Sequence, residues 1–154
     1  VDPLTIESNG ALPYGLASSP LGDEGEAVRR WTLVERGIAA GLSLGPREAA
    51  LRGREPNGGV RNLVVAPGTW DGVATGDRVL EVRRLRSLVI DPYTGDASLE
   101  IALALDRGQP ITGGSIRIDM IAALAHARRS TTTITRGAYA GPTALALGDT
   151  FLMS

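Results

Sequence analysis

The chain has 154 residues, a length typical of one domain that buries its hydrophobic core without disulfide bonds. Its 43% hydrophobic and 21% charged residues exclude the disordered and collagen-like classes. All 16 basic residues are arginine and 17 residues are acidic, so the net charge of −1 provides no general attraction for nucleic acid. No apolar run reaches the roughly 18 residues of a membrane span. The sequence therefore predicts a single domain over residues 1–154 that binds neither nucleic acid nor membrane.

The supply of metal-binding and nucleophilic side chains is small. The chain has no cysteine, which excludes a disulfide framework, a thiolate nucleophile and a sulfur-ligated zinc site. His126 is its one histidine. Because catalytic zinc ordinarily takes three protein ligands, mostly His or Cys, we expect no such site built from this chain alone. The chain begins at Val1 and shows no signal-peptide pattern, so we expect a cytoplasmic protein and a piece of a longer one.

The first third of the sequence predicts an extended segment, a hairpin and a short helix. Residues 1–27 have three prolines and no sustained period, which indicates an extended entry segment. Two apolar runs around Glu35-Arg36-Gly37 predict strands at 28–35 and 38–44. Pro46 and Gly53 stand where helices prefer to begin and end, so a helix is predicted between them.

The middle of the sequence predicts strands at 60–66, 78–90 and 98–105, the last from near-perfect apolar alternation. Between the second and third of these, Asp91, Pro92, Gly95 and Asp96 form the strongest turn pattern of the chain. Proline presets its own φ, glycine accepts a left-handed conformation, and aspartates accept bonds from backbone amides. We assign these four residues to a structural turn.

The last third predicts a strand at 109–118 after a turn at 106–108, then a helix capped by Asp119 and closed near Arg129. A Thr- and Gly-rich stretch at 130–141 and a final strand at 142–153 follow. The sum is an α+β fold, predominantly antiparallel β, arranged as a curved sheet or barrel-like, with two short helices.

Candidate sites from residue type alone are few. Histidine is the residue type best suited to acid-base chemistry at neutral pH, but His126 has no carboxylate or second histidine nearby in sequence, so we interpret it as a structural or surface residue. The alternative is a contact with peptide or partner, shared with Arg128 and Arg129. The carboxylates of Asp91, Asp96 and Glu100 do not have calcium-loop spacing. Three arginines at 83, 84 and 86 are typical of a solvated face, since six aromatic residues provide little capacity for stacking bases.

Several segments, taken in order, resemble one known family. Gly22-Asp23-Glu24-Gly25 followed by residues 29–37 is similar to a D-D/G-E-G motif and a Thr-rich strand that ends in an acidic-Gly hairpin. Residues 57–68 resemble a G-x-x-N-L-x-x-x-P-G strand. Residues 91–98, Asp-Pro-Tyr-Thr-Gly-Asp-Ala-Ser, resemble N-P-V-T-G-D-x-S, the most specific match.

The matches continue to the end of the chain. Residues 105–108 and 116–124 resemble an I-E-N-G hairpin with its following helix, and residues 142–145 resemble a closing P-S-L strand. Over about residues 12–153 the chain is thus similar to the C-terminal domain of the TldD/PmbA family, metallopeptidase-related proteins once labelled modulators of DNA gyrase.

The resemblance implies a function. TldD-type subunits of the family hold zinc with an H-E-x-x-x-H helix upstream of this domain and a late cysteine within it, whose place falls between Ser130 and Pro142. PmbA-type subunits, also called TldE, have no metal site and pair with TldD. The chain lacks the late cysteine, so the resemblance implies a non-catalytic PmbA/TldE-like subunit.

Such a subunit scaffolds a TldD-type zinc metallopeptidase that acts on unfolded or modified peptides. We expect no cofactor in this chain, zinc in the TldD-like partner, and peptide held by backbone pairing to a strand edge. A stand-alone β-rich binding module without a peptidase partner is the alternative, and association of identical copies stays open.

Overall fold

A computed structural model describes residues 3–72 and 79–147. The chain divides into two compact units, one formed by Val1–Gly72 with Arg129–Leu145 and the other by Val73–Arg128 with Ala146–Ser154. Two compact units can belong to one domain, so the single domain expected over residues 1–154 stays a prediction.

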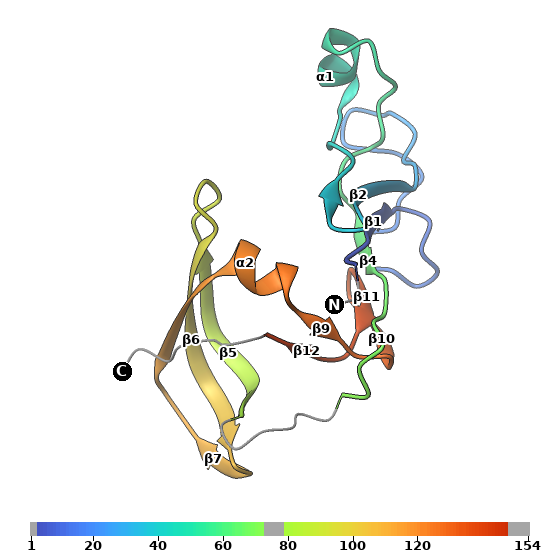
Figure 1. Ribbon diagram of the computed structural model, residues 1–154. Coiled ribbons are helices and arrows are strands. Elements are labelled where there is room, and N and C mark those ends of the chain that lie inside the picture. Colours follow the sequence, from blue (N-terminus) through green and yellow to red (C-terminus); the bar gives the residue numbers. More distant parts are fainter. Residues whose placement is uncertain (1–2, 73–78, 148–154) are drawn as a thin grey trace. The chain divides into compact units, whose positions relative to one another are not determined.

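The first unit is built on a six-stranded sheet with the order β10-β11-β4-β1-β2-β3 (Figure 1). The β4–β11 pair is parallel and the other neighbouring pairs are antiparallel. The strands are β1 (Ile6–Asn9), β2 (Trp31–Glu35), β3 (Ile38–Ala39), β4 (Asn62–Val65), β10 (Thr133–Arg136) and β11 (Tyr139–Pro142).

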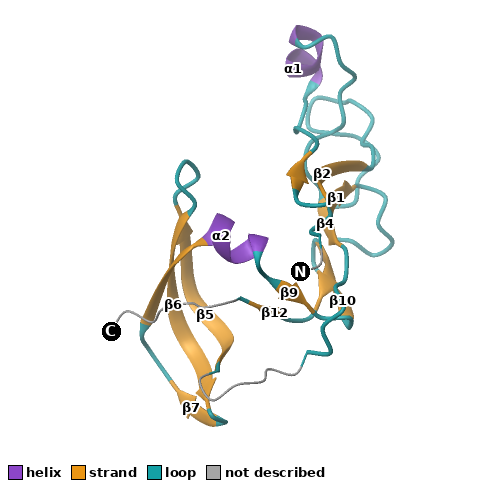
Figure 2. Ribbon diagram, viewed as in Figure 1, coloured by secondary structure: helices purple, strands orange, loops and turns teal. Residues whose placement is uncertain are grey.

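Strand β1 lies within residues 1–27, the segment that the sequence predicts to be extended. It lies inside the sheet and pairs with β2 on one side and β4 on the other. β1 has four residues and one β-branched side chain, too few for a detectable period in the sequence. Pairing with these two neighbours stabilises the strand. Most of residues 10–27 is loop, and Figure 2 shows that loops make up much of this unit.

The hairpin predicted around Glu35-Arg36-Gly37 is confirmed, with positive φ at Arg36 and Gly37, but its second strand ends at Ala39 instead of residue 44. The side chain of Asn57 explains the early end. It donates to the Leu42 carbonyl and accepts from the Leu44 amide, so residues 42–44 are held by Asn57 and do not continue the ladder. The predicted helix is α1 (Pro46–Leu51), which buries Ala49.

The second unit is built on a four-stranded antiparallel sheet and one helix. Strand β6 pairs with β5, with β7 and with β8. Helix α2 packs Met120 and Ala123 against the core of this unit. The elements are β5 (Leu80–Ile90), β6 (Asp96–Asp106), β7 (Gln109–Ile111), β8 (Ser115–Asp119) and α2 (Met120–Ala125). The buried core residues are Ala97, Ile101, Ala104, Ile116 and Ile118.

Strand β5 is irregular along its pairing with β6. Val82 and Arg84 pair with two consecutive residues of β6, and so do Leu85 and Ser87. Arg83 and Arg86, which lie between them, therefore have no partner in the ladder. Each is an extra residue of a β-bulge, a device that bends a strand and disfavours further pairing at its outer edge.

Three boundaries in the second half differ from the prediction. The strand expected at 109–118 is interrupted by Gly113 and Gly114, both with positive φ, and forms β7 and β8. The helix expected to reach Arg129 ends at Ala125, and β9 (Arg128–Arg129) follows. Of the strand expected at 142–153, the structure shows the end of β11 and β12 (Leu145–Ala146), which pairs with β9, while residues 148–153 lie outside the described residues.

The fold class is confirmed as predominantly antiparallel β with two short helices, and the curved-sheet form of the prediction is compatible with its open sheets. In the described part of the chain, no helix is long and apolar enough to cross a bilayer.

Replacing Gly95 by alanine tests the turn between β5 and β6. Gly95 has φ +82°, and an added Cβ would lie 2.8 Å from side-chain atoms of Ile121. We expect Gly95→Ala to lower the free energy of unfolding by about 2 kcal/mol or more, since backbone strain and overlap act together. Gly113→Ala is the control, because Gly113 also has φ +82° with no atom within 4 Å of the added carbon. Equal losses in denaturant titrations of both variants would show that the contact with Ile121 contributes nothing.

Candidate functional site

The hairpin of β10 and β11 gives the first unit a free sheet edge. β10 stands at the end of the strand order, and no further strand among the described residues pairs with it. All four of its residues, Thr133 to Arg136, are exposed. The register with β11 is regular, from Thr133 opposite Pro142 to Arg136 opposite Tyr139. A regular and exposed edge of this kind can accept another extended chain by backbone pairing.

The phase of the ladder decides which backbone groups of β10 face outward. Pro142, which lies opposite Thr133, has no N–H and cannot donate to it. In the neighbouring pair, the Thr143 amide donates to the Thr132 carbonyl at 3.0 Å. Since bonded and non-bonded pairs alternate in an antiparallel ladder, Ile134 and Arg136 bond to β11. The amides and carbonyls of Thr133 and Thr135 therefore face the open edge.

The buried amide of Asn62 anchors the loop that lies beside this hairpin. Its Oδ1 accepts from the Ala17 amide at 3.0 Å, and its Nδ2 donates to the Asn9 carbonyl at 2.8 Å and to Ser18 Oγ at 2.9 Å. Asn62 is fully buried, with 0% of its surface exposed. The loop held in this way donates the Leu16 amide to the Gly137 carbonyl, in the turn between β10 and β11.

Strand β11 is also fixed from its other side. The Leu63 amide of β4 donates to the Ala138 carbonyl at 2.8 Å, and the Tyr139 hydroxyl donates to the Pro142 carbonyl at 2.9 Å. Burial raises the pKa of the Tyr139 phenol above its ordinary value. The phenol thus stays protonated and able to donate at neutral pH.

The residues before β10 are held by buried polar groups. Ser130 Oγ donates to the Thr132 carbonyl at 2.8 Å and accepts from the Ala144 amide at 3.2 Å. The guanidinium of Arg129, with 2% of its surface exposed, donates to the carbonyls of Ala66 and Pro3. Both ends of the hairpin are thereby fixed, while its outer edge stays open.

The four predicted turn residues lie together between β5 and β6, in the second unit. Asp91 Oδ1 accepts from the Tyr93 and Thr94 amides, and the Gly95 amide donates to the Asp91 carbonyl. Asp96 accepts from Thr94 Oγ1, and the Gly95 carbonyl accepts from Met120 at the start of α2. Pro92 is exposed within the turn. The carboxylates of this turn therefore bond within the turn itself.

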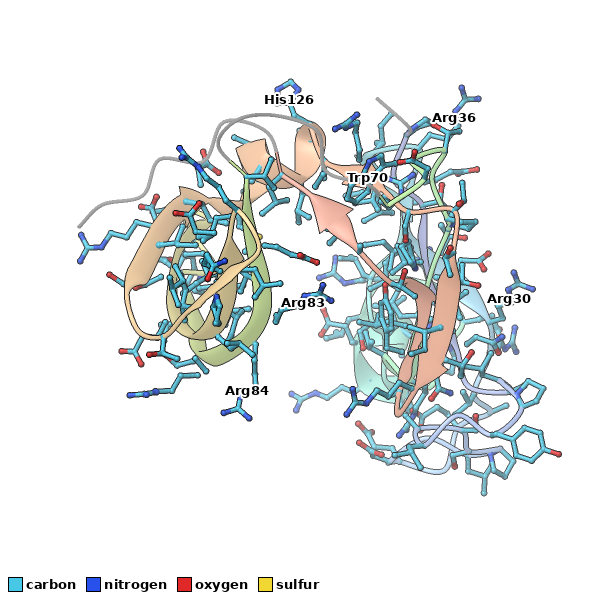
Figure 3. The ribbon with its side chains drawn as sticks, turned by 90° about the horizontal axis from the view of Figure 1, so that it is seen from below. Arg30, Arg36, Trp70, Arg83, Arg84 and His126 are labelled. Atoms are coloured by element: carbon cyan, nitrogen blue, oxygen red, sulfur yellow. The ribbon has the colours of Figure 1, made fainter. Side chains whose placement is uncertain are left out.

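The structure separates the other three predicted site residues. His126 is the exposed C-cap of α2 and points away from the ribbon (Figure 3). Arg128 is exposed and Arg129 is buried, both in β9 instead of the last helical turn. The prediction that both arginines close the helix was wrong, because pairing of β9 and the bonds of the Arg129 guanidinium hold this backbone extended.

The side chains of the hairpin do not fit zinc. Residues 130–142 contain no His, Cys, Asp or Glu, the donors that zinc takes from proteins. Across residues 3–72 and 79–147, no group of three such side chains is placed to hold a metal ion. What this site can do chemically is bind an extended backbone.

A family model matches almost the whole chain. The model of the PmbA/TldA metallopeptidase C-terminal domain matches residues 1–148, and the chain belongs to this family. The resemblance to TldD/PmbA proteins seen in the sequence is thereby confirmed. No curated protein sequence matches the chain.

Solved structures share the fold. A proposed modulator of DNA gyrase from Thermotoga maritima has a TM-score of 0.72 at 20% identity over 94% of this chain and 38% of its own. A second proposed modulator of DNA gyrase, from Bacteroides thetaiotaomicron, has a TM-score of 0.75 at 18% identity, over 98% of this chain and 37% of its own. TldE from Thermococcus kodakarensis has a TM-score of 0.71 at 19% identity, over 90% of this chain and 37% of its own. This chain thus spans a little over a third of the length of these proteins.

Sequence reasoning missed the elements that form this site. The sequence predicts only a Thr- and Gly-rich stretch at 130–141, although the β-branched residues 131–135 before Gly137 are typical of the first strand of a hairpin. Asn62 was noted within a strand motif, but its role depends on a loop more than forty residues away in sequence. No local pattern could reveal that contact.

Replacing Asn62 by alanine should release the loop over residues 9–18. The change removes three hydrogen bonds in a buried place, so we expect the free energy of unfolding to fall by about 3 kcal/mol. Asn9→Ala is the matched control, since the Asn9 side chain accepts one exposed bond, from Ala11, and should cost less than about 1 kcal/mol. Amide hydrogen exchange should show faster exchange at Ala17 in Asn62→Ala alone. Unchanged protection there would contradict the anchoring role.

Proposed function

We propose that this chain is the C-terminal domain of a PmbA/TldE-like subunit, which scaffolds a TldD-type zinc peptidase in the cytoplasm without performing the chemistry. The open β10 edge carries this proposal. It lies where the family resemblance expects the late zinc-binding cysteine, and it presents backbone groups instead of a metal ligand. Zinc then belongs to the TldD-like partner, whose substrates are unfolded or modified peptides.

Two other free edges, β3 and β5, suit a peptide less well than β10 does. β3 has two residues, too few for a stable ladder. β5 is longer, but the bulges at Arg83 and Arg86 break its register. β10 has four residues in regular register, and the backbone amides and carbonyls of Thr133 and Thr135 face the open edge. Pairing through amides and carbonyls accepts many side chains, as substrates of varied sequence require.

The second unit supplies candidate contacts of another kind. His126 and Arg128 are exposed. They remain candidates for a contact with peptide or with the partner subunit.

The non-catalytic role predicts the outcome of a peptidase assay. The chain with added zinc should leave an unstructured peptide intact. The same chain should co-purify with a TldD-type subunit that bears the H-E-x-x-x-H helix. Chelator-sensitive cleavage by the chain alone would contradict the proposal. Failure to bind any such subunit would favour the stand-alone binding module.

Proline at position 135 tests the peptide-binding edge. Thr135→Pro removes an outward amide while keeping the bonds from Ile134 and Arg136 to β11, and edge strands tolerate proline. Loss of one or two backbone hydrogen bonds should weaken binding of a labelled unstructured peptide about tenfold. Thr135→Val keeps the amide and should bind as the wild type does. Equal binding by both variants, measured by fluorescence anisotropy, would exclude this edge.

A further inference from the structure

The sequence contains two Asn-Gly pairs, Asn9-Gly10 and Asn57-Gly58, and both lie in the first unit. In such a pair the backbone nitrogen of the glycine can attack the side-chain carboxamide of the asparagine before it. Glycine favours this attack because it has no side chain to obstruct the approach and leaves its backbone free to move. Asparagine is accordingly one of the thermolabile residues of proteins. Each pair is therefore a candidate site of spontaneous deamidation.

The two pairs have similar local surroundings. Both asparagines are partly buried and both glycines are buried. A Cβ added to either glycine would overlap Val28, so both pairs pack against this one residue. In each pair the asparagine Oδ1 accepts from the amide two residues further on, Ala11 at 3.0 Å in the first and Gly59 at 3.3 Å in the second. These are the bonds of an Asx turn, and the two pairs share them.

The pairs differ in the hydrogen bonds that the carboxamide makes to distant backbone. The Nδ2 of Asn57 donates to the Leu42 carbonyl at 2.8 Å, and its Oδ1 also accepts from the Leu44 amide at 2.9 Å. These partners lie 15 and 13 residues away in the sequence, so the bonds exist only in the folded chain. The carboxamide must turn its face toward the Gly58 nitrogen before that nitrogen can attack. Turning it would break both bonds.

The carboxamide of Asn9 is held less firmly. Its Oδ1 accepts the local bond from the Ala11 amide, which is exposed to solvent. Among the described residues, no group accepts a hydrogen bond from its Nδ2, and no buried side-chain nitrogen lacks a partner, so water reaches this nitrogen. The carboxamide can therefore turn toward the Gly10 nitrogen at the cost of one exposed hydrogen bond.

We propose that Asn9 deamidates spontaneously in the folded chain, whereas the two tertiary bonds protect Asn57. The Gly10 nitrogen bonds to Cγ of Asn9, the C–N bond of the carboxamide breaks, and ammonia leaves with the proton of the Gly10 amide. Water then opens the resulting cyclic imide at either carbonyl. Opening at one carbonyl gives aspartate. Opening at the other gives isoaspartate, whose main chain runs through the former side chain.

The isoaspartate product alters the support of the loop over residues 11–21. The Asn9 carbonyl, which accepts from Asn62 Nδ2 at 2.8 Å, becomes part of a free carboxylate. The main chain gains a carbon atom between Asn9 and Gly10, which displaces the Gly10 carbonyl from the Ser19 amide that donates to it at 3.0 Å. The reactive asparagine is thus one whose backbone holds this loop. The proposal uses neither the β10 edge nor a peptide and stands apart from the proposed function.

Peptide mapping by mass spectrometry tests the proposal on the chain incubated at mildly alkaline pH. Cleavage after arginine gives a peptide of residues 1–29, whose one asparagine is Asn9, and a peptide of residues 55–61, whose one asparagine is Asn57. Deamidation raises the mass of a peptide, because OH replaces NH2. The first peptide should deamidate about tenfold or more faster than the second, since reaction at Asn57 requires two further hydrogen bonds to break.

The variant Asn9→Gln is the matched control, because the longer side chain closes the corresponding larger ring much more slowly. Its peptide of residues 1–29 should keep its mass over the same incubation. An equal mass increase in this variant would overturn the proposal. A sample digested without incubation gives the background of the digestion itself.

The same incubation in guanidinium chloride separates tertiary protection from local sequence. In the unfolded chain, Asn9 and Asn57 should deamidate at similar rates, because each is followed by glycine and neither retains its tertiary bonds. Equal rates in the folded chain, or a faster reaction at Asn57, would overturn the proposal. So would a folded chain in which Asn9 stays intact while both sites react in denaturant. A preference for Asn9 that persists unchanged in denaturant would assign the difference to local sequence and also overturn it.

Discussion

The buried side-chain amide of Asn62 is the interaction on which the first unit depends. This unit has little apolar interior, since its largest fully buried side chains are Leu44 and three polar residues, Asn62, Ser8 and Ser130. A buried polar group stabilises a fold only when it is bonded, and no buried side-chain nitrogen or oxygen in the described residues lacks a partner. Hydrogen bonding thus determines where the loops of this unit lie.

The same bonds leave specific surfaces free. Because Asn62 and Gly137 hold the loop over residues 11–21, and Ser130 holds the start of β10, the hairpin and this loop are ordered while their outer sides stay exposed. Residues that are anchored from within and exposed outside bind another molecule at a low entropic cost, because they are already ordered.

The second unit is stabilised differently. Its core is apolar, with Ala97, Ile101 and Ala104 of β6 facing β8 and α2. Small side chains on the central strand let the helix approach the sheet closely. Extra residues at Arg83 and Arg86 keep β5 paired with β6 while they disrupt the outer edge.

Local chemistry in the sequence determined the turns, most strands, both helix starts and the family. Asp91, Gly95, Gly37 and Pro46 act on their own backbone or that of near neighbours, so their effects could be predicted without a fold. The absence of cysteine and the single histidine likewise limited the metal chemistry. Tertiary structure alone decided the position of β1, the early end of α2, and the open edge of β10. Each of these depends on bonds between residues distant in sequence, such as Asn62 with Ala17 or Arg129 with Pro3, and no local pattern encodes them.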